Sequence, residues 1–140
     1  MTDTRPAIEI LPPTGQDEYR AGVCNIGPEE IARRRRAGHV GAVAALILLA
    51  ILIVIDAPPM ARLLVAIPVA MAASGYLQAR FRFCAGFGSR GVYNFGPLGT
   101  VETVADPEAR ARDRAMALRI GAASFVVGAA AGIVAFLLPI

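Results

Sequence analysis

Residues 40–55 read VGAVAALILLAILIVI, and this uncharged stretch decides the fold of the 140-residue chain. With the residues that flank it, from His39 to Ala57, it is about 19 residues long, or roughly 28 Å as an α-helix, which matches the hydrocarbon core of a bilayer. The arginines before it lie behind a long polar segment, which is not the arrangement of a secretory signal peptide. The stretch therefore predicts a membrane-spanning helix.

Two further stretches have the same apolar character. Residues 60–77 read MARLLVAIPVAMAASGYL, and residues 120–140 read IGAASFVVGAAAGIVAFLLPI. Both are long enough to span a bilayer. The sequence DAPP at residues 56–59 predicts a short turn between the first two spans, because proline ends helices. Pro68 lies inside the second stretch, where we expect it to kink the helix or loosen one backbone hydrogen bond.

The composition agrees with these spans. Hydrophobic residues make up 56% of the chain and charged residues only 18%, against about a quarter in soluble domains. We therefore expect an all-α integral membrane protein with three transmembrane helices. At this length the chain forms a single domain, which leaves no room for a large catalytic module beside the spans. The sequence contains no set of residues typical of a catalytic site, so we expect no catalytic activity of its own.

The pattern divides the chain into five segments. Residues 1–27 form a polar N-terminal tail, rich in proline and glycine, that we expect to be extended or loosely ordered. Residues 28–57 hold a helix start and the first span, and residues 60–79 the second. Residues 80–106 are rich in glycine and aromatic residues, which predicts a loop at the membrane surface rather than a stable helix. Residues 107–140 begin with an amphipathic segment and continue into the third span.

The arginines predict the orientation. All 14 basic residues are arginine, and with three spans Arg62 alone lies on one side of the membrane. The positive-inside rule then places the N-terminus and residues 80–106 in the cytoplasm and the C-terminus outside, as a multi-pass protein of a bacterial inner membrane. Arg62 lies near the end of its span, where we expect it to reach water or headgroups.

The arginines that flank the spans also predict partners. We expect those at the cytoplasmic ends to fix the topology and contact lipid headgroups, and we expect no nucleic-acid partner, because they cluster beside the apolar stretches. This group consists of Arg33, Arg34, Arg35, Arg36, Arg80 and Arg82.

Small residues recur at helical spacing in the spans. In membranes such faces allow helices to pack closely. The third span offers Ser124, Gly128 and Gly132, and the second offers Ala66, Ala70 and Ser74. Whether the face of the third span meets the other spans or a second protein stays open at this point.

Three other residues could form a metal site. Two thiolates and an imidazole are typical zinc or iron ligands, and Cys24, His39 and Cys84 all fall near the predicted cytoplasmic face. Their spacing matches no known metal motif, and cysteine also serves as a small apolar filler. His39 could alternatively ligate a haem or a chlorophyll-type pigment. The sequence identifies no cofactor.

These observations favour a small accessory or structural subunit of a larger membrane complex, with energy-transducing complexes among the candidates. The chain has little mass outside the membrane, and the one charge within the apolar stretches, that of Arg62, lies near an end, whereas transport sites place ionisable residues inside the spans. The tail and the glycine-rich loop would order best against other membrane subunits. The first alternative is a metal- or thiol-dependent site at Cys24, His39 and Cys84 on a membrane anchor. The second is a homo-oligomer that packs through Gly128 and Gly132.

Overall fold

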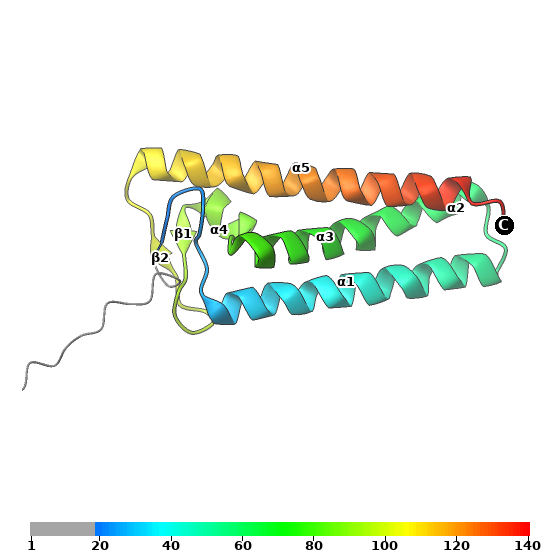
Figure 1. Cartoon of the computed structure of the whole chain (residues 1–140), viewed down its shortest axis with the longest axis horizontal. Helices are drawn as coiled ribbons and strands as arrows, with labels where there is room; N and C mark the ends of the chain where they lie inside the picture. The colour runs from blue at the N-terminus through cyan, green and yellow to red at the C-terminus, as the bar shows by residue number, and fades with distance from the viewer. Residues whose placement is uncertain (1–18) are drawn as a thin grey trace, which may run out of the picture.

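The computed structural model describes residues 19–140, which form three long segments of helix lying side by side (Figure 1). The elements are α1 (Pro28–Val54), α2 (Pro59–Arg62), a 3-10 turn η1 (Leu63–Val65), α3 (Ala66–Phe81), α4 (Ala85–Arg90), β1 (Val92–Tyr93), β2 (Glu102–Thr103) and α5 (Pro107–Leu137). Three helical segments are long and apolar enough to cross a membrane, namely Pro28–Val54, Pro59–Phe81 and Pro107–Leu137. The predicted all-α membrane fold with three spans is therefore confirmed.

The two longest helices begin with the same local chemistry. Pro28 and Pro107 occupy the first turns of α1 and α5, where the missing proline N–H has no helical partner to lose. Acidic residues follow in both first turns and complement the positive end of the helix dipole. At α5 the side chain of Asp106 also accepts a hydrogen bond from the main-chain N–H of Glu108, at 3.1 Å.

The second span runs from α2 through η1 into α3. Pro68 lies in the first turn of α3, and its missing N–H deprives the carbonyl group of Leu64, four residues earlier, of its α-helical partner. Leu64 itself belongs to the tighter 3-10 turn η1. The disturbance expected from Pro68 thus falls near the start of the span rather than in its middle. The span ends where Arg82 adopts a left-handed backbone conformation, with φ 51°.

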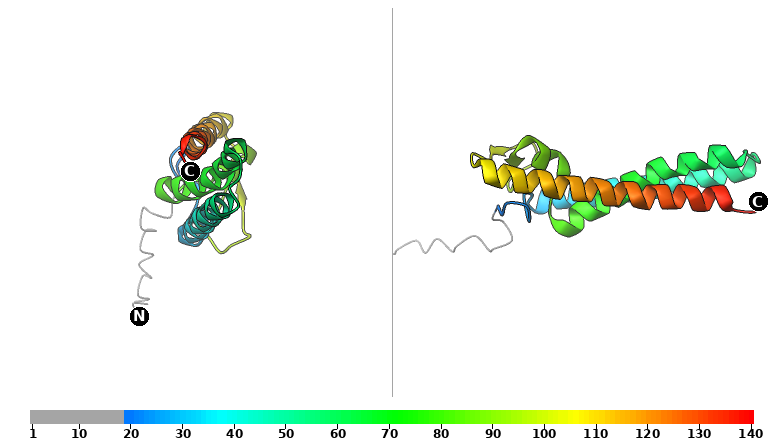
Figure 2. Two further views of the ribbon diagram at one scale, coloured as in Figure 1. Left: turned by 90° about the vertical axis from the view of Figure 1, so that its right-hand side faces the viewer. Right: turned by 90° about the horizontal axis from the view of Figure 1, so that it is seen from above.

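Helix α3 lies between α1 and α5 and packs against both (Figure 1). Seen from above, it crosses α5 at an angle, with its two ends on opposite sides of that helix (Figure 2). The crossing with α1 is close: a Cβ atom on Gly75 would lie 2.5 Å from the main-chain nitrogen of Gly38. One on Gly41 would lie 2.7 Å from that of Ala72. Only residues without large side chains permit this approach.

Two segments differ from the sequence-based expectation. Residues 80–106 contain the short helix α4 and the antiparallel pair β1–β2, so this region is not a loop throughout. Within the predicted tail, residues 19–27 fall in the described part of the chain, and they pack against the rest of it: Asn25 and Ile26 are fully buried. Both segments are ordered by contacts with each other, as the next section describes. The rest of the predicted tail lies outside the described residues.

Candidate functional site

One end of the bundle carries a small folded unit, called the cap below. It consists of residues 19–27 and 82–106, together with the polar first turns of α1 and α5. In Figure 1 these segments gather at the end opposite the C-terminus. The interior of the cap contains apolar residues, with Ile26, Cys84 and Phe87 in one cluster and Phe83 in another. It also contains the buried polar side chains of Asn25, Glu30, Asn94 and Asp113.

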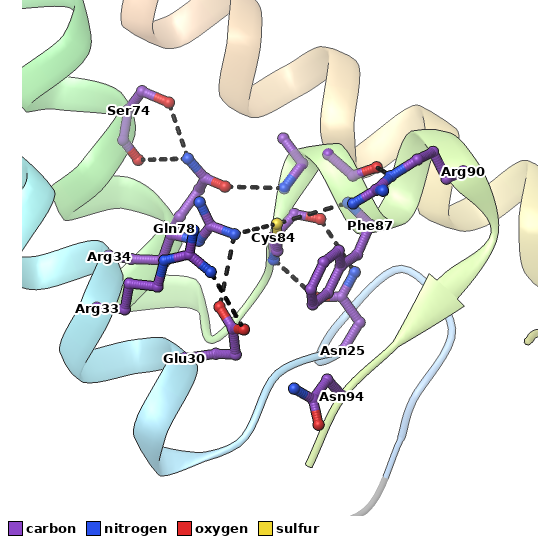
Figure 3. A network of polar contacts seen from close by, with 12 residues as sticks. Asn25, Glu30, Arg33, Arg34, Ser74, Gln78, Cys84, Phe87, Arg90 and Asn94 are labelled. Carbon is purple, nitrogen blue, oxygen red and sulfur yellow. Dashed lines mark hydrogen bonds and ion pairs between the residues drawn. The ribbon is translucent and has the colours of Figure 1, made fainter. Parts of the chain in front are cut away.

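Two asparagines join the N-terminal segment to the rest of the cap. The side-chain amide of Asn25 donates to the main-chain oxygen of Cys84 at 3.1 Å, and its oxygen accepts from the N–H of Cys84 at 2.6 Å. The main chains of Asn25 and Asn94 pair directly, since the N–H of Asn94 donates to the oxygen of Asn25 at 3.0 Å. Gly27 continues this pairing by donating to the oxygen of Asn94 at 2.8 Å. Figure 3 shows how Asn25 reaches Cys84.

The residues of this pairing repeat a short sequence. Asn25-Ile26-Gly27-Pro28 and Asn94-Phe95-Gly96-Pro97 share the pattern Asn-x-Gly-Pro, and the structure brings the two copies together. Asparagine followed by glycine and proline is typical of an ordered turn. Sequence reasoning missed both asparagines, and this repeat is the signal that could have found them.

A second contact fixes the start of the N-terminal segment. The fully buried carboxylate of Asp113 on α5 accepts hydrogen bonds from the Tyr19 hydroxyl and the Gly22 N–H, each at 2.7 Å. The ring of Tyr19 stacks on that of Tyr93, with ring centres 4.7 Å apart. Burial raises the pKa of Tyr19, and the hydrogen bond to the Asp113 carboxylate raises it further.

The thiol of Cys84 lies between α1 and α4. Its Sγ accepts a hydrogen bond from Nη2 of Arg34 at 2.9 Å and one from the main-chain N–H of Phe87 at 3.5 Å. Cys84 therefore acts as the N-cap of α4 and as a contact for an arginine of α1 (Figure 3). The ring of Phe87 lies under two guanidinium groups, those of Arg34 and Arg90, at 5.9 and 5.3 Å.

The four-arginine run divides among different environments. Arg33 and Arg34 lie 3.7 and 3.6 Å from the carboxylate oxygens of Glu30, which is 1% exposed. Neither Oε2 of Glu30 nor Nε of Arg34 has a hydrogen-bond partner among the described residues. Arg35 and Arg36 are exposed. Two residues of the run thus pair with Glu30, and of these only Arg34 is partly buried, since the Arg33 side chain is 58% exposed.

The structure does not bring Cys24, His39 and Cys84 together as a metal site. Cys24 is buried, with its Sγ 3.9 Å from the main-chain oxygen of Ile26, and Cys84 contacts Arg34. His39 is exposed, and its Nδ1 lies 2.7 Å from the hydroxyl of Tyr76. Within residues 19–140 no group of three or more His, Cys, Asp and Glu side chains is placed to hold a metal ion.

The small residues of the third span face the second. A Cβ atom on Gly128 would lie 2.6 Å from the main-chain oxygen of Ala66 and 2.7 Å from Cβ of Ala70, and one on Gly132 would lie 2.9 Å from Cβ of Ala66. The Ser124 hydroxyl is buried and donates to the oxygen of Ile120 in its own helix at 2.7 Å. Ser74 instead accepts a hydrogen bond from Gln78, at 2.9 Å. The Gly128–Gly132 face is thus occupied by α3 of the same chain.

Arg62 differs from its expected position. The sequence suggests a side chain that reaches water or headgroups, but the structure buries Arg62 to 3% exposure. Its guanidinium donates to the main-chain oxygen of Leu138 at 2.9 Å and to that of Ile140. The last carbonyl groups of a helix lack partners within the helix, and Arg62 supplies donors to the residues that follow α5. This pairing explains why the arginine folds inward.

Comparison with known proteins assigns the chain to no family. No family model matches the chain, and neither a curated protein nor a solved structure shows significant similarity to it.

Proposed function

We propose that the chain is a small structural subunit of a larger membrane complex, with a partner protein that contacts the cap. The observation that carries the proposal is an exposed apolar pair outside the spans. Leu98 and Val101 lie in the turn between β1 and β2, and they are 46% and 53% exposed. Single exposed apolar residues are common on protein surfaces, so the position of this pair relative to the membrane decides its meaning.

The pair lies too far from the bilayer core to be covered by lipid tails. The main-chain N–H of Leu98 donates to Oε2 of Glu29 at 3.1 Å, which fixes the turn beside the start of α1. Glu29 lies ten residues before His39, where the apolar part of α1 begins, and this separation is about 15 Å along a helix. The headgroup layer is only about 5–8 Å thick on each side. A second protein would cover the pair at this depth.

The ordered cap narrows the surface available to a partner. Residues 19–27 and 82–106 satisfy much of each other's hydrogen-bonding potential, so neither segment depends on a partner for its order. The β1–β2 turn differs because its residues 96–101 are all exposed. We therefore assign the contact to this turn and not to the whole loop.

We further propose that the cap lies in the cytoplasm of a bacterial cell and the α2 end of the bundle outside. The cap and its flanking helix turns carry nearly all the arginines of residues 19–140, and the opposite end carries Arg62, which is buried. A strong difference in arginine content across the membrane favours the cytoplasm for the rich side.

Purification in mild detergent tests the subunit role. The wild-type chain is expected to co-purify with a discrete partner in fixed stoichiometry. Leu98→Asp is expected to lose that partner, because it places a charge in a buried apolar contact. Ser89→Asp is the matched control: Ser89 is an exposed residue of α4 in the same cap, and the change adds the same charge.

Two results would argue against the proposal. One is isolation of the wild-type chain as a lone monomer under these conditions. The other is a partner retained equally by Leu98→Asp and Ser89→Asp, which would move the contact away from the turn. Circular dichroism of both variants establishes that the cap and the helices remain folded.

A further inference from the structure

A groove of about 520 Å³ lies between α1 and α3 at the boundary between the apolar spans and the cap. On α1 it is lined by Ile31, Arg35 and His39, which lie one turn apart on the same helix face. On the other side it is lined by Tyr76, Ala79, Arg80 and Arg82. Three guanidinium groups and no carboxylate therefore surround one groove.

The wall of the groove is held in place by the helix crossing. The ring of Tyr76 lies directly over Gly38, where a Cβ atom would come within 2.8 Å of the ring. This contact directs the Tyr76 hydroxyl to Nδ1 of His39, at 2.7 Å, and the two rings meet edge to face. The groove thus lies beside a closely packed helix crossing, and the absence of a side chain at Gly38 makes this crossing possible.

The charges at the groove are not neutralised within the described chain. Arg35, Arg80 and Arg82 are exposed, and no carboxylate of residues 19–140 lies within ion-pair distance of them. Their neighbours Arg33 and Arg34 differ, because both pair with Glu30. Three clustered and unneutralised guanidinium groups form a site for an anion with several oxygen atoms.

The position of the groove along the membrane normal indicates which anions can reach it. Arg35 lies four residues before His39 and Arg80 lies three residues after Leu77, so they lie about 6 Å and about 4.5 Å outside the apolar stretches. This is the depth of the phosphate groups of a bilayer. Toward the membrane, the helix face of Arg35 and His39 continues through Val43 and Ile47, which are exposed and apolar. An acyl chain would lie along this face.

We propose that the groove binds one anionic phospholipid, with its phosphate held by Arg35, Arg80 and Arg82 and an acyl chain along Val43 and Ile47. The Tyr76–His39 pair separates the headgroup part of the site from the acyl part. Basic pockets between transmembrane helices bind anionic headgroups by the same chemistry. The inference depends on the three spans and not on the proposed subunit role, so each can fail without the other.

Lipid titration of the full chain in detergent, followed by native mass spectrometry, tests the site. The wild type is expected to bind one phosphatidylglycerol in preference to phosphatidylcholine with the same acyl chains. The double variant Arg35→Gln, Arg80→Gln is expected to bind it roughly 25-fold more weakly, at about fivefold for each arginine near an anionic surface. Both residues are exposed, so the fold should tolerate the change.

The control removes the same charge elsewhere. Arg36→Gln with Arg114→Gln changes two exposed arginines that do not line the groove, and it should alter the affinity by less than about threefold. An equal loss in both double variants would overturn the proposal, because it would show diffuse attraction to total charge. No loss in either variant would also overturn it. So would inorganic phosphate that competes as well as the lipid, since the acyl chain would then contribute nothing.

Discussion

At the scale of single residues, Asn25 stabilises the cap by binding main-chain groups. Its one carboxamide satisfies both the N–H and the carbonyl of Cys84, and all of these groups are buried. A buried polar group that loses its partner costs about 1–3 kcal/mol. Asn25 thus joins the N-terminal segment to the junction of α3 and α4.

Asn25→Ala should lower the stability of the cap by about 1–3 kcal/mol, because it leaves the buried N–H of Cys84 without its partner, whereas the Cys84 carbonyl still accepts from the N–H of Gly88 at 2.9 Å. Hydrogen exchange at residues 82–94 in detergent is the appropriate measurement, and it should rise there before it rises in the spans. Ser89→Ala is the control, since its exposed hydroxyl bonds only to Ala85 in the same helix. Equal exchange in the two variants would show that Asn25 does not support the cap.

Tyr19 predicts a dependence on alkaline pH. Burial and the Asp113 carboxylate raise its pKa above the ordinary value of 10.0, so the folded cap holds the phenolic proton more tightly than the unfolded chain does. The resulting stabilisation is complete below pH 10 and is lost as the pH rises from there through the raised pKa. Tyr19→Phe should remove this loss, as measured by alkaline unfolding of the cap, with Tyr76→Phe as a tyrosine-deletion control. A wild-type cap equally stable across this range would contradict the assignment.

The polar residues of the cap could not be selected from the sequence alone. Cysteine and histidine are selected from a sequence because they are common metal ligands. In the structure, however, His39 contacts Tyr76 and Cys84 caps helix α4. Asn25 and Cys84 are 59 positions apart, and Tyr19 and Asp113 are 94 apart. No local pattern encodes pairs at such separations. The repeated Asn-x-Gly-Pro sequence indicates two turns but not that they pair.

At the scale of elements, the contact between α3 and α5 depends on the lack of side chains at Gly128 and Gly132. Gly128→Ala should destabilise this contact by about 1–3 kcal/mol, because its Cβ would lie 2.6 Å from the oxygen of Ala66 and the helices must separate. Gly121→Ala is the matched control on the same helix, where a Cβ atom would meet nothing within 4 Å. This control should stabilise the helix slightly.

Denaturant unfolding in detergent micelles measures both variants. Gly128→Ala should lower the denaturation midpoint, and Gly121→Ala should leave it unchanged or raise it. A Gly128→Ala protein as stable as the wild type would mean that α3 and α5 do not pack through this face. The Gly128–Gly132 pair would then be available to a second protein.

Some elements can be predicted from neighbouring residues in the sequence, whereas others form only through contacts between distant residues. The starts of α1 and α5 follow from proline and acidic residues within one turn. Helix α4 contains Gly86 and Gly88, which disfavour a helix in isolation. It forms because Gly88 lets it rest on the buried ring of Phe83, and a Cβ atom there would lie 2.7 Å from that ring. Tertiary packing thus outweighs local propensity in this helix.

At the scale of the whole molecule, the apolar stretches predict three spans, but they do not predict which helix packs between the other two. The central position of α3 follows from its small residues on two faces, with Gly75 and Ala72 toward α1 and Ala66 and Ala70 toward α5. The sequence shows these small residues without showing which helix each one meets. For the cap, in contrast, the sequence alone predicts a loose tail and a surface loop, because residues 19–27 and 82–106 are ordered by their contacts with each other.

Fusion of a topology reporter after Ala57, after Gly91 and after Ile140 tests the central claim, which is three spans with the cap in the cytoplasm. The reporter should lie outside in the Ala57 fusion, in the cytoplasm in the Gly91 fusion and outside in the Ile140 fusion. The alternation tests the number of spans, and the position of the Gly91 fusion tests the orientation. A Gly91 fusion found outside would reverse the orientation, and fusions at Gly91 and Ile140 found on the same side would contradict the third span.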